Sequence, residues 1–167
     1  VDTHGQQVGG ARASKTLALH QRIYQAALAS DPGTRCVIHT HSTHCVALSL
    51  KGAAHPGPFG PELLPALTPY FVMKVGHVPL IPYHRPGDPA VADAVAHVIA
   101  RHAQAGHPIR AVMLERLGPN VWHDSPEQAM ATLDELEETA HLWQLAPVAP
   151  LTEAHIADLR RQFGSRW

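Results

Sequence analysis

The stretch Cys36-Val37-Ile38-His39-Thr40-His41-Ser42-Thr43-His44 joins an apolar run to a histidine-x-histidine pair, and a third histidine follows three residues later. The run predicts a β-strand over 36–41, in which side chains at positions i and i+2 point to the same face. His39 and His41 are therefore expected to project together as two imidazoles on one side of a sheet. Two neutral imidazoles so placed are suitable ligands for a divalent metal such as Zn²⁺.

The same pattern has a second interpretation, in which His39 and His41 are partly exposed strand residues with no ligand. The chain contains 14 histidines, so some clustering is expected by chance. Two ligands also do not complete a metal shell. Spacing alone does not orient His44, which follows the expected end of the strand.

Length and composition restrict the class of protein. The 167 residues are expected to form a single domain over 1–167, and 45% hydrophobic with 16% charged residues are typical of a globular protein. A formal net charge of −1, with no basic stripe, argues against a nucleic acid partner. No apolar run reaches 18 residues, so no membrane-spanning helix is expected.

The N-terminal residues and the two cysteines indicate the cellular compartment of the protein. The first residues lack the basic and apolar regions of a signal peptide, and Val1 in place of Met indicates a trimmed or processed product. Cys36 and Cys45 are expected to be buried, reduced thiols, since nine residues of extended chain hold them too far apart for a disulfide. Both observations favour a cytoplasmic protein.

Helices and short strands are expected to alternate along the chain, which predicts one α/β or α+β domain. Apolar periodicity and capping residues predict helices over 14–29 (with Ser14 as N-cap), 43–50, 89–104, 126–145 and 152–163. An irregular loop is expected over 51–61. Short strands are expected twice within 70–83, and as a hairpin of 111–114 with 120–122.

With these elements placed, the chain resembles the class II aldolase/adducin family. The matching motifs are Ser14-Lys15, Leu19-His20, Ile23-Tyr24, Val37-Ile38-His39-Thr40-His41-Ser42, the segments 67–76 and 82–88, and the later helix 133–140. Within the family the likeness is greatest to the branch of 3-oxo-tetronate 4-phosphate decarboxylases. That branch carries a similar Thr-Pro-Tyr segment and a similar Arg-Pro-Gly-Asp loop.

The resemblance implies a three-layer α/β/α fold with a largely antiparallel central sheet, assembled as a homotetramer. It implies a metal-dependent lyase acting on a small phosphorylated sugar acid, with Zn²⁺ or another divalent cation such as Mn²⁺ near a subunit interface. By motif match, His39 and His41 take the first two metal positions. Ser14 and Lys15 fall beside the substrate phosphate, and Tyr70 is a candidate proton donor.

Three departures from the family pattern bear on activity. Leu117 stands where the family has its third metal histidine, and His44, His123 or Glu115 are candidates to replace that ligand. Thr16 stands at the acid/base glutamate, and a hydroxyl does not exchange protons near neutral pH as a carboxylate can. A further family stretch, which cradles phosphate, precedes the position of Val1, so the domain is expected to be incomplete at its N-terminus.

Three functions therefore remain open: a working lyase, a catalytically inactive relative that acts through assembly or protein interaction, and a simple metal-binding protein. Arg85 and Asp88 are candidates for contact with substrate or a neighbouring subunit, but the favoured interpretation is a structural turn in which Asp88 bonds local amides. Other residues are expected to be structural or solvated: the carboxylates Glu135, Glu137 and Glu138, the surface histidines His97, His102 and His107, and the packing residues Trp122, Trp143 and Trp167.

Overall fold

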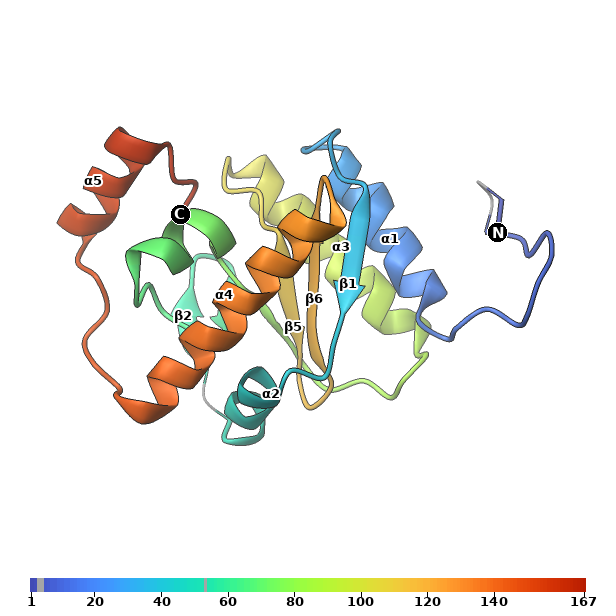
Figure 1. The fold of residues 1–167 in the computed structure, drawn as a ribbon, viewed down its shortest axis with the longest axis horizontal. Coiled ribbons are helices and arrows are strands. Elements are labelled where there is room, and N and C mark those ends of the chain that lie inside the picture. The colour runs from blue at the N-terminus through green and yellow to red at the C-terminus, as the bar shows by residue number, and fades with distance from the viewer. Residues whose placement is uncertain (3–4, 53) are drawn as a thin grey trace.

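The computed structural model describes residues 1–2, 5–52 and 54–167. Its centre is a four-stranded sheet in the order β1-β6-β5-β4 (Figure 1). The strands are β1 Cys36–His39, β4 Leu80–Ile81, β5 Ala111–Leu114 and β6 Gly118–His123. The β1–β6 and β5–β6 pairs are antiparallel, whereas β4 pairs with β5 in parallel. The predicted largely antiparallel sheet is confirmed, with one parallel edge that makes it mixed.

Helices cover both faces of the sheet and give the predicted three layers (Figure 1). On one face lie α1 Leu17–Leu28 and α3 Pro89–Gln104, and on the other lie α4 Pro126–Leu145 and α2 Thr43–Leu50. Successive side chains of β6 point to opposite faces of the sheet, so this strand contributes to the apolar core on each face. Val121 packs with the α4 side, and the next residue, Trp122, packs with the α1 and α3 side. Trp122 is therefore a packing residue, as predicted.

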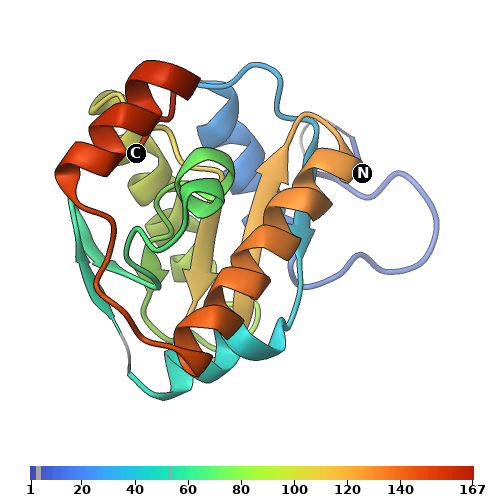
Figure 2. The ribbon, with the colours of Figure 1, turned by 60° about the vertical axis from the view of Figure 1, so that its left-hand side comes forward.

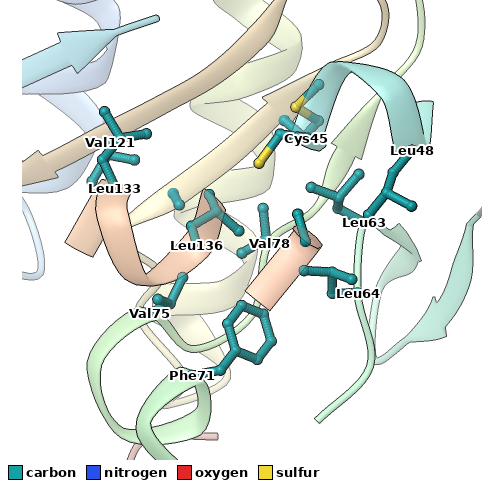
Figure 3. Packing of buried hydrophobic residues seen from close by; sticks show 13 residues of the cluster. Cys45, Leu48, Leu63, Leu64, Phe71, Val75, Val78, Val121, Leu133 and Leu136 are labelled. Atoms are coloured by element: carbon teal, nitrogen blue, oxygen red, sulfur yellow. The ribbon is translucent and has the colours of Figure 1, made fainter. Parts of the chain in front are cut away.

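The core on the α4 side is a continuous apolar cluster (Figure 3). Phe71, Val78 and Leu136 are fully buried within it. Figure 2 shows that α5 Glu153–Phe163 lies beside the segment that carries Phe71, at the C-terminal end of the chain. Within the described residues, no helix is both long and apolar enough to cross a membrane.

The helix starts test the capping predictions. Asp88 begins α3 by accepting a hydrogen bond from the Ala90 amide at 3.0 Å, and Ser125 begins α4 by accepting from Gln128 at 3.2 Å, both as predicted. Ser14 as the cap of α1 is wrong. The helix begins at Leu17 with Thr16 at the N-cap position, and Ser14 Oγ accepts from the Thr16 amide and lies 2.9 Å from the Thr16 hydroxyl in the turn before the helix.

Two segments differ from the sequence prediction. The residues Phe71–Val75 form a π-helix, η1, in place of the first expected strand of 70–83. A short apolar run does not distinguish strand from helix by periodicity, and here Phe71 and Val75 turn toward the same core. The expected loop 51–61 contains a hairpin of β2 His55–Gly57 and β3 Gly60–Glu62, while Ala53 lies outside the described residues.

Three residues have a different burial from the one predicted: His102, Glu137 and Cys36. For His102 and Glu137 the reason is a contact with a residue distant in the sequence. His102 is 1% exposed, since its ring packs edge-on against Phe59 with centroids 4.8 Å apart. Glu137 is half-buried and accepts from the amides of His44 and Cys45 at 2.7 and 3.0 Å, so it caps α2. Both cysteines are free; Cys45 is buried in α2, but Cys36 is only half-buried.

Candidate functional site

The end of β1 places two imidazoles side by side. His39 is the last residue of β1 and His41 follows two positions later, with ring centroids 5.1 Å apart and ring planes at 75°. The Nδ1 atom of each ring contacts a backbone carbonyl in the turn between β5 and β6 or at the start of β6. The His39 Nδ1 lies 3.0 Å from the Pro119 carbonyl, and the His41 Nδ1 lies 2.6 Å from the Leu117 carbonyl.

These carbonyl contacts assign the tautomer that each ring has when it is neutral. A carbonyl only accepts hydrogen bonds, so Nδ1 carries the proton and donates it, and Nε2 keeps its lone pair. Burial lowers the pKa of His39, a bond to Pro119 partly opposes this, and the neighbouring His41 lowers it further. His39 is therefore a neutral imidazole at pH 7, with an Nε2 able to accept a proton or bind a metal.

Gly118 allows the β5–β6 turn to approach the end of β1 this closely. Its φ is +137°, and a Cβ at this position would collide with the backbone carbonyl of Thr40. Only glycine fits such an approach without strain. The turn, and with it the Leu117 and Pro119 carbonyls that hold the two imidazoles, is thus positioned by a residue with no side chain.

The two imidazoles line a cavity of about 270 Å³ between the start of α1, the loop before α3 and the end of β5. Lys15 and Thr16 line it from the α1 side, and His84 and Arg85 line it from the loop. The remaining lining is largely apolar but includes one carboxylate, that of Asp88: Ala18, Leu19, Pro86, Gly87, Asp88, Pro89, Val91, Ala92, Leu114 and Leu117. The cavity therefore combines cationic groups, imidazoles and one carboxylate with a largely apolar lining, and it is open to solvent, since Lys15, His41 and Arg85 are exposed.

The structure brings together some of the residues predicted for the site. Lys15 lies in the cavity with His39 and His41, and Ser14 bonds its neighbour Thr16 at the cavity edge. Tyr70 lies elsewhere: it precedes η1, is 58% exposed, and has Lys74 Nζ 5.1 Å from its ring centroid. Its role as a proton donor stays a prediction.

The donor set was tested against the divalent metal that the resemblance implies. Leu117 lines the cavity where a third histidine was expected. The candidate replacements are engaged elsewhere: His44 stacks on His141 at 4.1 Å, His123 lies 2.7 Å from Asp124, and Glu115 accepts from the Tyr83 amide at 2.9 Å.

Over residues 1–2, 5–52 and 54–167, no three or more His, Cys, Asp or Glu side chains are grouped to hold a metal. A catalytic zinc site needs three protein ligands. The chain thus offers two well-oriented imidazoles, which fit part of such a site, but not the complete ligand set.

Sequence reasoning missed His84, and for Arg85 it favoured a structural turn over contact with substrate or a neighbouring subunit. Both residues line the cavity with Lys15. The only sequence signal was the Arg-Pro-Gly-Asp motif, whose position next to α1 depends on tertiary packing. Asp88 in the same motif does bond a local amide, as predicted.

Comparisons with known proteins show the family of the chain. Residues 1–144 match the family described as Class II Aldolase and Adducin N-terminal domain. A 3-oxo-tetronate 4-phosphate decarboxylase from Cupriavidus necator is 48% identical over 174 residues, which cover 100% of this chain and 73% of the relative. The protein of the same name from Escherichia coli strain K12 is 35% identical, over 96% of this chain and 70% of the relative.

Solved structures show the same fold. The crystal structure of YgbL from Klebsiella pneumoniae has a TM-score of 0.78 and 32% identity, over 96% of this chain and 72% of that one. An L-fuculose 1-phosphate aldolase has a TM-score of 0.70 at 22% identity, over 98% of this chain and 70% of that one. The second likeness concerns the fold alone.

Proposed function

The chain belongs to the class II aldolase and adducin N-terminal domain family, and from this premise we propose that it is a carbon–carbon lyase. Its proposed substrate is a small phosphorylated sugar acid of the 3-oxo-tetronate 4-phosphate type, from which it releases CO₂. The observation that carries the proposal is the cavity that joins Lys15 to the paired imidazoles of His39 and His41.

The phosphate end of the substrate is proposed to lie at the start of α1. Ser14, Lys15 and Thr16 directly precede this helix, and among the described residues no side chain caps its first amides. The Leu17 amide donates to the Ser14 carbonyl at 3.1 Å, so among the described residues the Ala18 and Leu19 amides remain for an anion. Free amides at a helix N-terminus favour an anion, and the Lys15 ammonium adds a full positive charge. This arrangement supports binding of a phosphate dianion beside the imidazole pair.

The reaction breaks the bond between the carboxyl carbon C1 and C2. The electron pair forms a C2–C3 double bond, and negative charge develops on the C3 oxygen as CO₂ leaves. Lys15, which lines the cavity, is proposed to stabilise that charge. The free Nε2 atoms of His39 and His41 accept hydrogen bonds from substrate hydroxyls and so orient the carbon chain.

Protonation of C2 completes the reaction and gives a three-carbon keto phosphate. Thr16 supplies no titratable group for this step, so water delivers the proton. A tuned general acid typically contributes about 10²–10⁴-fold in rate. We therefore propose a slow lyase. For the Zn²⁺ or Mn²⁺ implied by the family, the described residues provide two ligands, His39 and His41, and no group of three. The homotetramer is also part of the proposal.

A second candidate function is that of an inactive relative that acts through assembly. The observation that favours it is that Leu117 and Thr16, at two positions with family functions, both line the same cavity. This candidate predicts substrate binding, or a stable oligomer, without CO₂ release.

Product formation from 3-oxo-tetronate 4-phosphate, generated in the cuvette and followed by a coupled reductase, tests the proposal. The wild-type chain is expected to form the keto phosphate above the spontaneous rate, and Lys15→Met is expected to lose this activity. Arg35→Gln is a matched control, because Arg35 is an exposed cation that does not line the cavity. No turnover by wild type, with or without Zn²⁺ or Mn²⁺, would favour the assembly function.

A further inference from the structure

Arg85 is a cation at the cavity whose guanidinium donates no hydrogen bond to any residue that the structure describes. Its side chain is 71% exposed, and its Nε lies 3.8 Å from Asp88 Oδ2, which is too long for a hydrogen bond. The other Asp88 oxygen accepts from the Ala90 amide at 3.0 Å. Among the described residues the guanidinium therefore keeps all its hydrogen-bonding capacity for a ligand.

The loop that carries Arg85 is held in place at both ends. At its start, the Tyr83 amide donates to Glu115 at 2.9 Å, and Glu115 belongs to the turn that holds the two imidazoles. At its end, Asp88 caps α3. The backbone of Gly87, at φ +82°, packs against Lys15, since a Cβ there would lie 3.5 Å from the Lys15 Cβ. The backbone on both sides of Arg85 is thus held at the cavity that Lys15, His39 and His41 also line.

On the basis of the proposed function, we propose that Arg85 binds the carboxylate of the substrate and makes this cavity select sugar acids over neutral sugar phosphates. The phosphate end is already provided for by Lys15 and the start of α1. The planar guanidinium presents two parallel donors that match the two oxygens of a carboxylate. His84, half-buried beside it, lines the same cavity and bonds no described residue.

This role has a kinetic signature. The carboxylate is charged in the bound substrate and becomes neutral CO₂ as the C1–C2 bond breaks, so its attraction to Arg85 weakens toward the transition state. An interaction that is strongest in the ground state aids binding and does not accelerate the chemical step. Loss of Arg85 is therefore expected to raise KM while kcat stays unchanged or rises.

Two inert ligands separate this role from general anion binding. A tetronate 4-phosphate carries both the carboxylate and the phosphate, and the matching tetritol phosphate has CH₂OH in place of the carboxylate. Neither has the C3 ketone, so neither is turned over. Calorimetric titration of both ligands would be run on wild type, Arg85→Gln, Arg85→Lys and the control Arg35→Gln.

Wild type is expected to bind the tetronate about tenfold more tightly than the tetritol, as one charge-assisted pair would give. In Arg85→Gln the two affinities should agree within about twofold, with the tetritol unchanged from wild type, and Arg85→Lys should be intermediate. A tetronate preference that survives in Arg85→Gln, or an equal loss for both ligands, would overturn the assignment of Arg85 alone. Binding of neither ligand by wild type would overturn the proposed substrate class together with it.

Discussion

Replacing Leu117 by histidine is predicted to create a zinc site in a cavity that now has two oriented imidazoles. The Leu117 carbonyl lies 2.6 Å from His41 Nδ1, and the Leu117 side chain lines the cavity with His39. A third imidazole would therefore enter beside two Nε2 atoms that already carry free lone pairs. Three histidines with an open fourth position are the ligand set of catalytic zinc.

The size of the effect follows from ligand number. Structural zinc sites with four ligands bind with roughly 10–16 kcal/mol, so one added imidazole contributes about 3 kcal/mol, or about a hundredfold in Kd. Leu117 is partly buried against the α1 and α3 core, and removing its apolar contacts should reduce folding stability by about 1 kcal/mol. The gain in zinc affinity should far exceed this loss.

Competition with a chromophoric chelator would measure the Zn²⁺ affinity of wild type, Leu117→His and Leu117→Phe. The Leu117→Phe variant is a control, because phenylalanine is a planar ring like histidine but has no atom that binds a metal. Co²⁺ loading would report tetrahedral coordination by its visible spectrum, and adding His39→Ala to Leu117→His should abolish the gain. Equal affinities in wild type and Leu117→His, or an equal gain in Leu117→Phe, would refute the reasoning.

Three further predictions concern stability, measured by urea unfolding. Glu137→Ala should lose about 1–3 kcal/mol because it removes the cap of α2, whereas the exposed Glu138→Ala should lose under about 0.5 kcal/mol; equal losses would contradict this. Gly118→Ala should lose more than about 2 kcal/mol through its contact with Thr40, and wild-type stability would argue against the close approach. The pKa of His102 is lowered from 6.5 to about 4, first by burial and then by the neighbouring His77 and His107. Between these two pH values the unfolded state binds more protons than the folded state. The free energy of unfolding should therefore fall as the pH drops from about 6.5 to 4. The slope should approach about 1.4 kcal/mol per pH unit and flatten in His102→Asn; an unchanged slope would contradict this origin.

Local sequence was sufficient for much of the architecture. The helix α3 was predicted at its observed bounds, since Asp88 and the proline after it mark a start that packing does not alter. The proximity of His39 and His41 was predicted from the two-residue period of a strand over 36–41, although β1 ends at His39 and His41 follows it. These features depend on neighbours in the sequence, and such neighbours can be read directly.

Features that depend on distant contacts were not predictable in the same way. Glu137 was expected in solvent, but it caps a helix that begins more than 90 residues earlier, as the separation of 93 from His44 shows. The apolar run at Phe71 fits a strand and a helix equally well, and the core decides between them. Arg85 joins the cavity only because its loop packs on Lys15.

The most direct test of the central claim follows the bond that the proposed reaction breaks. The substrate 3-oxo-tetronate 4-phosphate, labelled with ¹³C at C1, would be incubated with the wild-type chain and with Lys15→Met, and labelled CO₂ would be measured against a protein-free sample. The account predicts labelled CO₂ above the spontaneous rate with wild type only. Equal release in all three samples would contradict a lyase function for this cavity.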